Sequence, residues 1–415
     1  MQTTSLIKSS PNIKGLACRD CGKFFEISLN HACDECFGAL DVIYDFEKAK
    51  PSKDRIALRE KNMWRYRELL PFDPVDAIYD IQAGYTPLIK AKKLGEKLGL
   101  KELYIKNDSV NPTFSFKDRP AAVGVNAAIH FGLDTVGCAS TGNLASATAA
   151  YAARAGLNCL VFVPANTERT KVAQARAYGA KLIEVDGTYD DVNRLVSQAA
   201  DLYNIGVVNV NLRPYYVEGS KTLAFEVAEQ MNWEAPDAFI VPTASGAMFN
   251  AICRGFEELR QLNLINEEPS NPIVAQAEGC NPIVKAFKKN SDHIEVIEKP
   301  KTIALSLAIG NPGDGVYVLK RLKKKGFAED ASDDEIVEGI CLLAKYEGIF
   351  TEPAGGVVIA VLKKLVDEGK IDRSDKVVCY ITGNGLKTSE VISDKLESVT
   401  LIKPNLKELE RVING

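Results

Sequence analysis

The chain has 415 residues, 46% hydrophobic and 26% charged, which is typical of a water-soluble globular protein with two or three domains. Its formal net charge of −4 gives no reason to expect nucleic acid or an anionic membrane surface as a partner. No apolar run approaches the roughly 20 residues of a membrane span, and Met1–Lys8 lacks the basic and apolar parts of a secretory signal.

Two closely spaced cysteine pairs come first along the chain. Eleven residues separate the pairs, each of which has the spacing Cys-x-x-Cys: Cys18, Cys21, Cys33 and Cys36. Four thiolates fill a tetrahedral zinc site and leave no open position, so such a metal would be structural. A metal is favoured because so small a module, with few large apolar residues, has little other means of holding its fold. The alternative is two redox-active dithiols or a spacing that arose by chance.

The other six cysteines are scattered among apolar residues: Cys138, Cys159, Cys253, Cys280, Cys341 and Cys379. Buried free thiols in a reducing compartment explain this distribution better than disulfides do. We therefore expect a cytoplasmic protein.

From about residue 84 onward, short β-branched runs alternate with helical patterns. The predicted strands are Leu103–Lys106, Thr135–Cys138, Cys159–Val163, Lys181–Val185, Val207–Val210, Ala238–Val241, Ile273–Gln276 and Lys376–Ile381. Near-continuous apolar strands between helices predict parallel sheets covered on both faces. Because there are more strands than one compact sheet usually holds, we expect an α/β protein with two doubly wound domains and a cleft between them.

A lysine with an unusual setting lies in the run Asn111–Arg119. Lys117 stands between an aromatic-rich loop and the start of a helical pattern, and Phe114 and Phe116 precede it. Two rings beside the amine favour its neutral form, which a lysine that forms a Schiff base and then acts as a base requires. The alternative is an ordinary solvated surface lysine.

Three further junctions, rich in small residues, follow predicted strands: Ser140–Asn143, Thr243–Ala247 and Thr382–Gly385. Backbone N–H groups at such strand-to-helix turns can hold an anion. In Thr243–Ala247 only small side chains are present, so the backbone can close around a phosphate. The alternative for Ser140–Asn143 and for Thr243–Ala247 is a plain turn with a helix N-cap. One suitable lysine together with several such loops is what a pyridoxal phosphate site needs.

Several of these segments resemble threonine synthase, a family in the fold-type II group of pyridoxal phosphate enzymes. The resemblance runs from about Gly84 to Lys387 and is most specific in Asn111–Arg119, Ala139–Asn143, Arg213–Thr222 and Thr382–Lys387. The cysteine module also looks like the short N-terminal segment of many archaeal and bacterial members. The resemblance implies a fold similar to the β subunit of tryptophan synthase, preceded by a small zinc-ribbon-like module.

The resemblance also implies roles for individual residues. Lys117 would bind the cofactor as a Schiff base, Asn143 would contact its phenolic oxygen, and Thr382 would meet its pyridine nitrogen. The phosphate cup would be formed by Thr243, Ala244, Ser245, Gly246 and Ala247. Candidates for the substrate phosphate are Ser140, Thr141, Asn211 and Arg213, since hydroxyls, amides and a guanidinium suit phosphate. Some members carry an arginine directly before their Glu-Gly-x-Lys-Thr; Tyr216 is close to that place here, and Arg213 lies earlier.

The implied activity is conversion of O-phospho-L-homoserine and water to L-threonine and phosphate by a carbon–oxygen lyase. Two alternatives within the group are a threonine or serine dehydratase and a synthase that uses O-phosphoserine. A zinc-ribbon interaction protein on an inactive enzyme scaffold is the alternative from another class. The expected partner is this small-molecule substrate, with neither nucleic acid nor membrane, and the resemblance allows a homodimer.

The expected domain limits follow from the same reading. Residues 1–45 would form the N-terminal segment with the cysteine module, residues 46–118 and 221–415 the large cofactor-binding domain, and residues 119–220 the small α/β domain.

Overall fold

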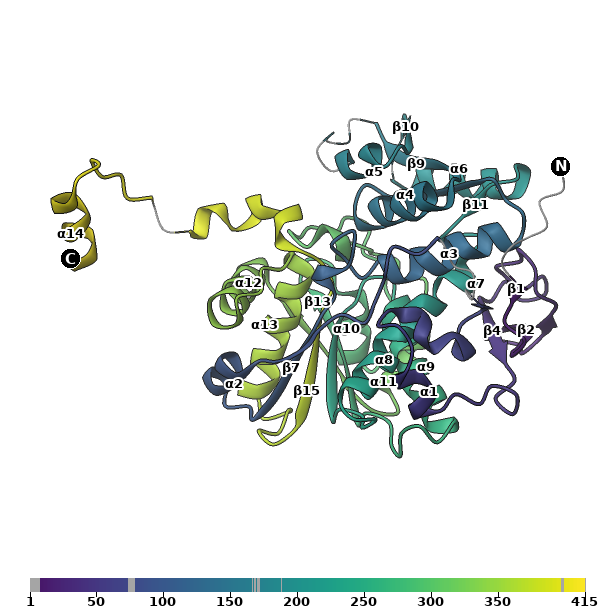
Figure 1. The fold of residues 1–415 in the computed structure, drawn as a ribbon, viewed down its shortest axis with the longest axis horizontal. Coiled ribbons are helices and arrows are strands. Elements are labelled where there is room, and N and C mark those ends of the chain that lie inside the picture. Colours follow the sequence, from purple (N-terminus) through teal and green to yellow (C-terminus); the bar gives the residue numbers. More distant parts are fainter. Residues whose placement is uncertain are drawn as a thin grey trace.

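A six-stranded sheet forms the centre of the larger of the two α/β parts of the protein (Figure 1). The computed structural model describes residues 8–73, 79–165, 167, 169, 172–187, 189–396 and 399–414. The strand order is β14-β13-β12-β15-β7-β6, with parallel neighbours except for β6 and β7. The strands are β6 (Leu88–Lys90), β7 (Glu102–Asn107), β12 (Ala238–Pro242), β13 (Asn271–Ala277), β14 (Phe327–Ala331) and β15 (Lys376–Ile381). The sequence predicted β7, β12, β13 and β15, but neither edge strand.

Helices cover both faces of this sheet, as apolar parallel strands require. One face carries α2 (Lys92–Leu98), α12 (Asp333–Glu347) and α13 (Pro353–Asp367), and the other carries α8 (Glu218–Gln230), α9 (Ala247–Gln261), α10 (Pro282–Lys288) and α11 (Gly315–Leu322). Strand β15 contributes side chains to both faces of the sheet. Val377 and Cys379 pack with the first set of helices, whereas Val378 and Tyr380 pack with the second. Burial of alternate side chains on opposite faces explains why the strand is apolar throughout.

A second, all-parallel sheet with the order β10-β9-β8-β11 lies beside the first (Figure 1). Its strands are β8 (Thr135–Ala139), β9 (Asn158–Pro164), β10 (Lys181–Val185) and β11 (Gly206–Val207). The helices around it are α3 (Asp118–His130), α4 (Asn143–Ala155), α5 (Ala173–Ala177), α6 (Tyr189–Leu202) and α7 (Arg213–Tyr216). The predicted α/β class with two parallel sheets is confirmed.

One predicted strand, Val207–Val210, is mostly wrong. Only Gly206 and Val207 pair in the sheet, and the chain then turns. The cause is Asn211, whose side-chain oxygen accepts from the N–H of Val207 (2.7 Å) and whose amide donates to the Ile205 carbonyl (2.9 Å). A side chain that bonds its own backbone in this way offers an alternative to the ladder and ends the strand.

The N-terminal segment forms a small antiparallel sheet that packs on the rest of the protein. Its strands are β2 (Ile13–Cys18), β3 (Phe24–Phe25) and β4 (Leu40–Tyr44), in the order β3-β2-β4, while β1 (Lys8–Ser9) pairs with β5 (Phe72–Asp73). Tyr44 donates a hydrogen bond to Glu218 (2.7 Å), and Tyr215 donates one to the Ser28 carbonyl (2.7 Å). The first seven residues of the predicted segment lie outside the described residues.

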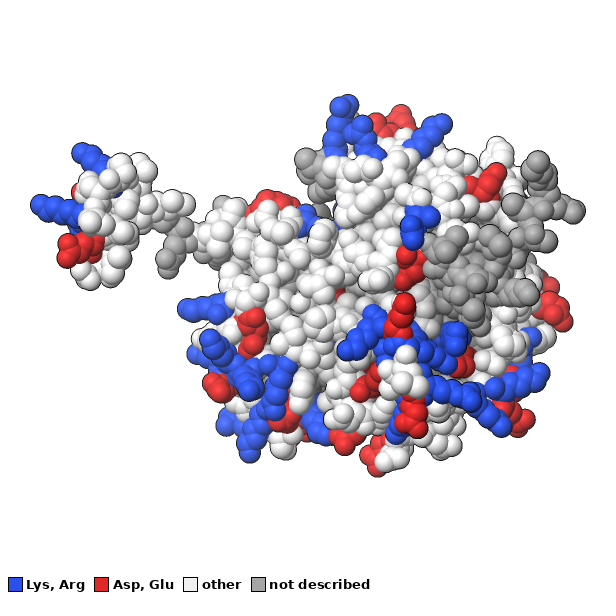
Figure 2. All heavy atoms as spheres, in the orientation of Figure 1, with Lys and Arg blue, Asp and Glu red and all other residues white. Residues whose placement is uncertain are grey.

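The remaining elements are short or peripheral. They are α1 (Lys53–Ala57), α14 (Leu406–Asn414) and the 3-10 helices η1 (Met63–Leu69), η2 (Asp108–Val110), η3 (Leu305–Leu307), η4 (Gly385–Lys387) and η5 (Ser389–Lys395). Helix α14 projects from the body in Figure 1 and buries none of its residues. Figure 2 shows basic and acidic side chains interspersed over the large-sheet part of the visible face. Among the described helices, none has the length and apolarity to cross a bilayer.

Candidate active site

The loop that carries Lys117 is folded by buried charges on either side of the lysine. Asp118 accepts hydrogen bonds from the backbone N–H (3.1 Å) and the hydroxyl (2.8 Å) of Thr113, which closes the loop. Arg119 pairs with Asp108 at 2.6 Å and with Glu226. Both Asp118 and Arg119 are fully buried. These contacts fix Lys117 as the residue that enters α3, as the sequence predicts.

Lys117 itself lies in an environment that favours the neutral amine. Desolvation lowers the pKa of Lys117 to about 8, although the charge of Glu352 opposes the shift. The Phe116 ring centroid is 4.6 Å from the amine, and the Tyr216 hydroxyl is 3.3 Å from it. The predicted contribution of Phe114 is wrong, because that side chain is 50% exposed on a left-handed residue (φ 65°). Tyr216, whose contact with Lys117 the sequence did not reveal, lies there in its place.

Thr382 approaches the Lys117 loop from the end of β15. Its carbonyl accepts a hydrogen bond from the N–H of Phe116 (2.9 Å), and Ser115 and Gly383 form a bridge next to it. The Thr382 side chain is almost fully buried, and its hydroxyl makes no hydrogen bond to any part of the chain that the structure describes. The hydroxyl is therefore available to a bound molecule, as its predicted role requires.

Residues 243–247 join β12 to α9 at the same edge of the sheet, because β12 pairs with β15 and β15 with β7 in parallel. The backbone N–H groups of Ala244, Ser245 and Gly246 have no hydrogen-bond partner among the described residues. They precede α9, a helix of 15 residues whose N-terminus favours negative charge. The Thr243 hydroxyl already donates to the Val241 carbonyl (2.9 Å). The loop thus fits a phosphate held by backbone N–H groups.

Asn143 begins α4 and ties three parts of the site together. Its amide nitrogen donates to the Glu352 carboxylate (3.0 and 3.2 Å), and its oxygen accepts from the Lys387 amine (2.8 Å). Burial raises the pKa of Glu352 and lowers that of Lys387. Neither Glu352 nor Lys387 is among the site residues predicted from the sequence. Two sequence signals could have pointed to them: Glu352 directly precedes Pro353, which starts a helix, and Lys387 ends the segment Thr382–Lys387.

The predicted substrate-phosphate residues are more dispersed. Ser140 lies with Thr141 in the turn before Asn143, and its hydroxyl accepts from the N–H of Gly142 (3.3 Å). Asn211 bonds its own loop through both ends of its amide. Arg213 pairs with the buried Asp314 (2.5 Å), while its other terminal nitrogen, Nη1, is buried without a partner among the described residues. Whether any of them binds substrate remains a prediction.

The four cysteines of the N-terminal module converge as predicted. All four Sγ atoms lie within 4.8 Å of one another; Cys18 and Cys36 are 3.4 Å apart, and Cys21 and Cys33 are 3.6 Å apart. Bonds of about 2.3 Å to a central zinc ion would place sulfurs about 3.8 Å apart in a tetrahedron. The observed spacing fits that geometry.

Pyridoxal phosphate enzymes need a lysine whose amine can be neutral and a loop for the cofactor phosphate. Both lie here at the carboxyl edge of one parallel sheet, where α/β proteins bind their ligands. The fold and the site therefore define this class. The family model described as "Pyridoxal-phosphate dependent enzyme" matches residues 80–383.

Similar proteins narrow the class. The chain is 42% identical to a threonine synthase of Methanocaldococcus jannaschii over 95% of this chain and 98% of that one. It is 39% identical to a threonine synthase of Methanosarcina acetivorans over 96% of this chain and 98% of that one. Among solved structures, threonine deaminase isoform 2 from Solanum lycopersicum matches 74% of this chain and 86% of its own with a TM-score of 0.63. The sequence identity is 21%, so this likeness shows the fold alone. The chain belongs to the pyridoxal phosphate-dependent enzymes and, within them, to the threonine synthase family.

Proposed function

We propose that the protein converts O-phospho-L-homoserine and water to L-threonine and phosphate. The observation that carries this proposal is the near full-length likeness to threonine synthases, together with a lysine of lowered pKa beside a phosphate-binding loop. The alternatives are a threonine or serine dehydratase and an O-phosphoserine-using synthase, and the assay below separates the last of these from the proposed reaction.

Pyridoxal phosphate, when bound, supplies an electron sink for charge that develops on the substrate carbons. Residues 243–247 hold its phosphate through backbone N–H groups, and the glycine at 246 supports this role. Gly246 has a left-handed backbone (φ 93°), and a Cβ there would lie 2.7 Å from Val318 Cγ2. Thr382 would hydrogen bond to the pyridine nitrogen as a neutral hydroxyl, which would leave that nitrogen largely unprotonated. Asn143 would contact the phenolic oxygen.

Lys117 binds the cofactor and moves the substrate protons. Its pKa of about 8 makes the neutral amine accessible near neutral pH, as both tasks require. The amine takes the proton from Cα and returns it before product release. Tyr216, 3.3 Å away, orients the amine through its hydroxyl.

The substrate contributes a second phosphate, for which Ser140, Thr141, Asn211 and Arg213 are the proposed ligands. Arg213 has the best chemistry, since a guanidinium forms two parallel hydrogen bonds to phosphate. Its Nη1 is buried and has no hydrogen-bond partner in the described chain, so this nitrogen can donate to a phosphate oxygen of the substrate. Lys387 adds a second cation beside the Ser140 turn through its contact with Asn143 (2.8 Å).

The N-terminal module is proposed to hold a structural zinc ion. Cys18, Cys21, Cys33 and Cys36 offer four thiolates at tetrahedral spacing and leave no position for a substrate. The module packs on the catalytic body through Tyr44 and Tyr215, so loss of the metal would loosen that contact. A cytoplasmic location and a homodimer complete the proposal.

The proposed domain limits agree with the two sheets. Strands β6 and β7 fall in residues 46–118 and strands β12 to β15 in residues 221–415, whereas β8 to β11 fall in residues 119–220. The limit between residues 220 and 221 lies within α8, whose apolar residues pack with the larger sheet.

The deciding experiment compares two substrates. Purified holoenzyme is supplied with O-phospho-L-homoserine or O-phospho-L-serine, and released phosphate and the amino-acid product are both quantified. We expect threonine and phosphate in equal amounts from the first substrate. Turnover of phosphoserine alone, or 2-oxobutyrate as the main product, would refute the proposed reaction.

A further inference from the structure

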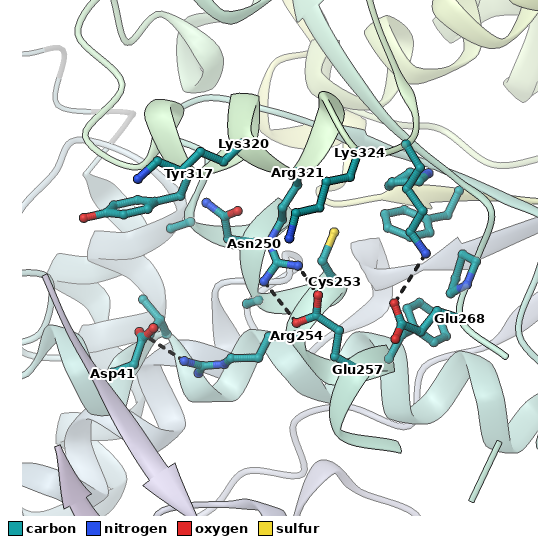
Figure 3. Close-up of a pocket in the computed structure, with 18 of the residues that line it drawn as sticks. Asp41, Asn250, Cys253, Arg254, Glu257, Glu268, Tyr317, Lys320, Arg321 and Lys324 are labelled. Atoms are coloured by element: carbon teal, nitrogen blue, oxygen red, sulfur yellow. Dashed lines mark hydrogen bonds and ion pairs between the residues drawn. The ribbon is translucent and has the colours of Figure 1, made fainter. Parts of the chain in front are cut away.

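A cavity of about 410 Å³ lies between α9 and α11, with the N-terminal cysteine module at one end (Figure 3). Arg19 and Asp41 of that module line it together with Asn250, Arg254 and other residues of α9 and α11. Lys117, Asn143 and Thr382 are not among the described residues that line it. Of the predicted site residues, the cavity lining includes Ala247, at the end of the proposed phosphate loop, so the cavity adjoins that loop at one residue. Its volume is that of a small-molecule site.

The charges that line the cavity leave a surplus of cations. Each carboxylate already has a basic partner: Asp41 pairs with Arg19 and Arg254, Glu257 with Arg321, and Glu268 with Lys325. Two lysines remain, Lys320 and Lys324, four residues apart on the α11 side of the cavity (Figure 3). The Lys320 amine is 3.9 Å from Asp20, and Lys324 has no ion pair within the described part of the chain.

The rest of the lining is apolar except for the buried amide of Asn250 and the hydroxyl of Tyr317, which already donates a hydrogen bond to Asp20 (2.7 Å). The apolar part consists of Val217, Phe239, Ala247, Ala251, Cys253, Phe256, Pro269 and Pro272. Asn250 is only 5% exposed; its amide nitrogen donates to the Asp314 carbonyl (3.2 Å), while its oxygen is buried without a hydrogen-bond partner among the described residues. An unpaired buried acceptor costs free energy unless a ligand donor satisfies it. The chemistry fits a molecule with an anionic head, an apolar body and a hydrogen-bond donor.

Asp314 connects this cavity to the catalytic loops. Its N–H donates to the Ser245 carbonyl in the loop 243–247 (2.9 Å), and its carboxylate accepts from Arg19 and Arg213 (both 2.6 Å). A molecule in the cavity would touch Arg19 and Asn250, and both of these residues hold Asp314. A molecule bound in the cavity can therefore change the affinity of the loop 243–247 for its own ligand.

We propose that this cavity binds an anionic small molecule with an apolar body, and that its occupancy is coupled through Asp314 to the cofactor phosphate loop. The acidic head lies against Lys320 and Lys324, and the apolar body lies along Ala251 and Phe256. The coupling part of this proposal rests on the assignment of residues 243–247 to the cofactor phosphate. The binding part does not.

Binding is tested with anilinonaphthalene sulfonate, an aromatic anion whose fluorescence rises in apolar surroundings. The holoenzyme is titrated as wild type, as Lys320→Glu/Lys324→Glu, and as Lys92→Glu/Lys93→Glu, a matched charge change on the exposed start of α2. We expect one saturable site whose Kd rises at least tenfold in the cavity variant and stays within twofold of wild type in the control. Equal Kd values in all three proteins would overturn the site, because the probe would then be bound elsewhere.

Coupling is tested by the rate at which the holoenzyme loses cofactor on dilution, followed by cofactor absorbance. Probe at a concentration that fills the wild-type site but leaves the site of Lys320→Glu/Lys324→Glu largely empty should change this rate at least threefold in the wild type and leave it unchanged in the variant. The same rate with and without probe would overturn the coupling through Asp314, whatever the enzyme's substrate proves to be. A probe Kd that rises as the protein dimerises would show that a second copy covers the cavity and would also overturn the proposal.

Discussion

Gly246 gives the sharpest test of the phosphate loop, because two separate penalties meet at one position. Its φ of 93° lies in the left-handed region, where a residue with a Cβ costs about 1–2 kcal/mol. The Cβ of an alanine would also lie 2.7 Å from Val318 Cγ2 and 3.2 Å from the Asp314 carbonyl. Such overpacking costs about 1–3 kcal/mol more. We therefore expect Gly246→Ala to lose about 2–5 kcal/mol of unfolding free energy in total.

The chain supplies a matched control in Gly132, in the turn after α3. Its φ is 71°, and a Cβ there would meet nothing within 4 Å. Gly132→Ala should therefore lose only the backbone part, about 1–2 kcal/mol, and keep its cofactor affinity. The difference between the two variants isolates the packing at the phosphate loop.

The assay is denaturant unfolding of both variants and of the wild type, with a cofactor titration followed by absorbance. Gly246→Ala should bind the cofactor at least tenfold more weakly, because any shift that relieves the clash moves the N–H groups at the start of α9. If it matched Gly132→Ala in stability and kept wild-type cofactor affinity, residues 243–247 would not be the phosphate loop.

Four further results are expected. Lys117→Ala should abolish turnover and borohydride-reducible cofactor linkage, and activity near wild type would refute the assignment of the lysine. The rate at which cofactor-free protein captures pyridoxal phosphate should fall about tenfold per pH unit below about 8 and level off above it, since only the neutral Lys117 amine is nucleophilic; stopped-flow absorbance that shows no such break would contradict this. Arg213→Ala should lower kcat/KM for phosphohomoserine roughly ten- to a hundredfold, and wild-type kinetics would remove it from the site. Chelation should release one zinc per chain and lower Tm; protein purified without metal, yet equally stable, would argue against a structural site at Cys18–Cys36.

Local patterns predicted much of the fold. Strand β15 was readable because every residue from Val377 to Ile381 is apolar, and such a run is stable only as a strand covered on both faces. Strand β14, with the sequence Phe-Ala-Glu-Asp-Ala, has no such pattern and exists because β13 offers it a parallel edge. Strand β11 ends early because the Asn211 amide bonds the backbone, a competition that residue types alone do not decide.

The sequence by itself determined the chemistry at each loop: a lysine after aromatic residues, small residues where backbone must approach an anion, and thiols at metal spacing. These signals are local, because turn conformation and metal chelation depend on neighbours within a few residues. Only the tertiary structure decided which distant residues meet. Glu352 and Lys387 join Asn143 across more than 200 residues of chain, and Asp314 joins Arg19 to Arg213. Pairing of buried charges over such separations depends on how the sheets pack, which no short stretch of sequence encodes.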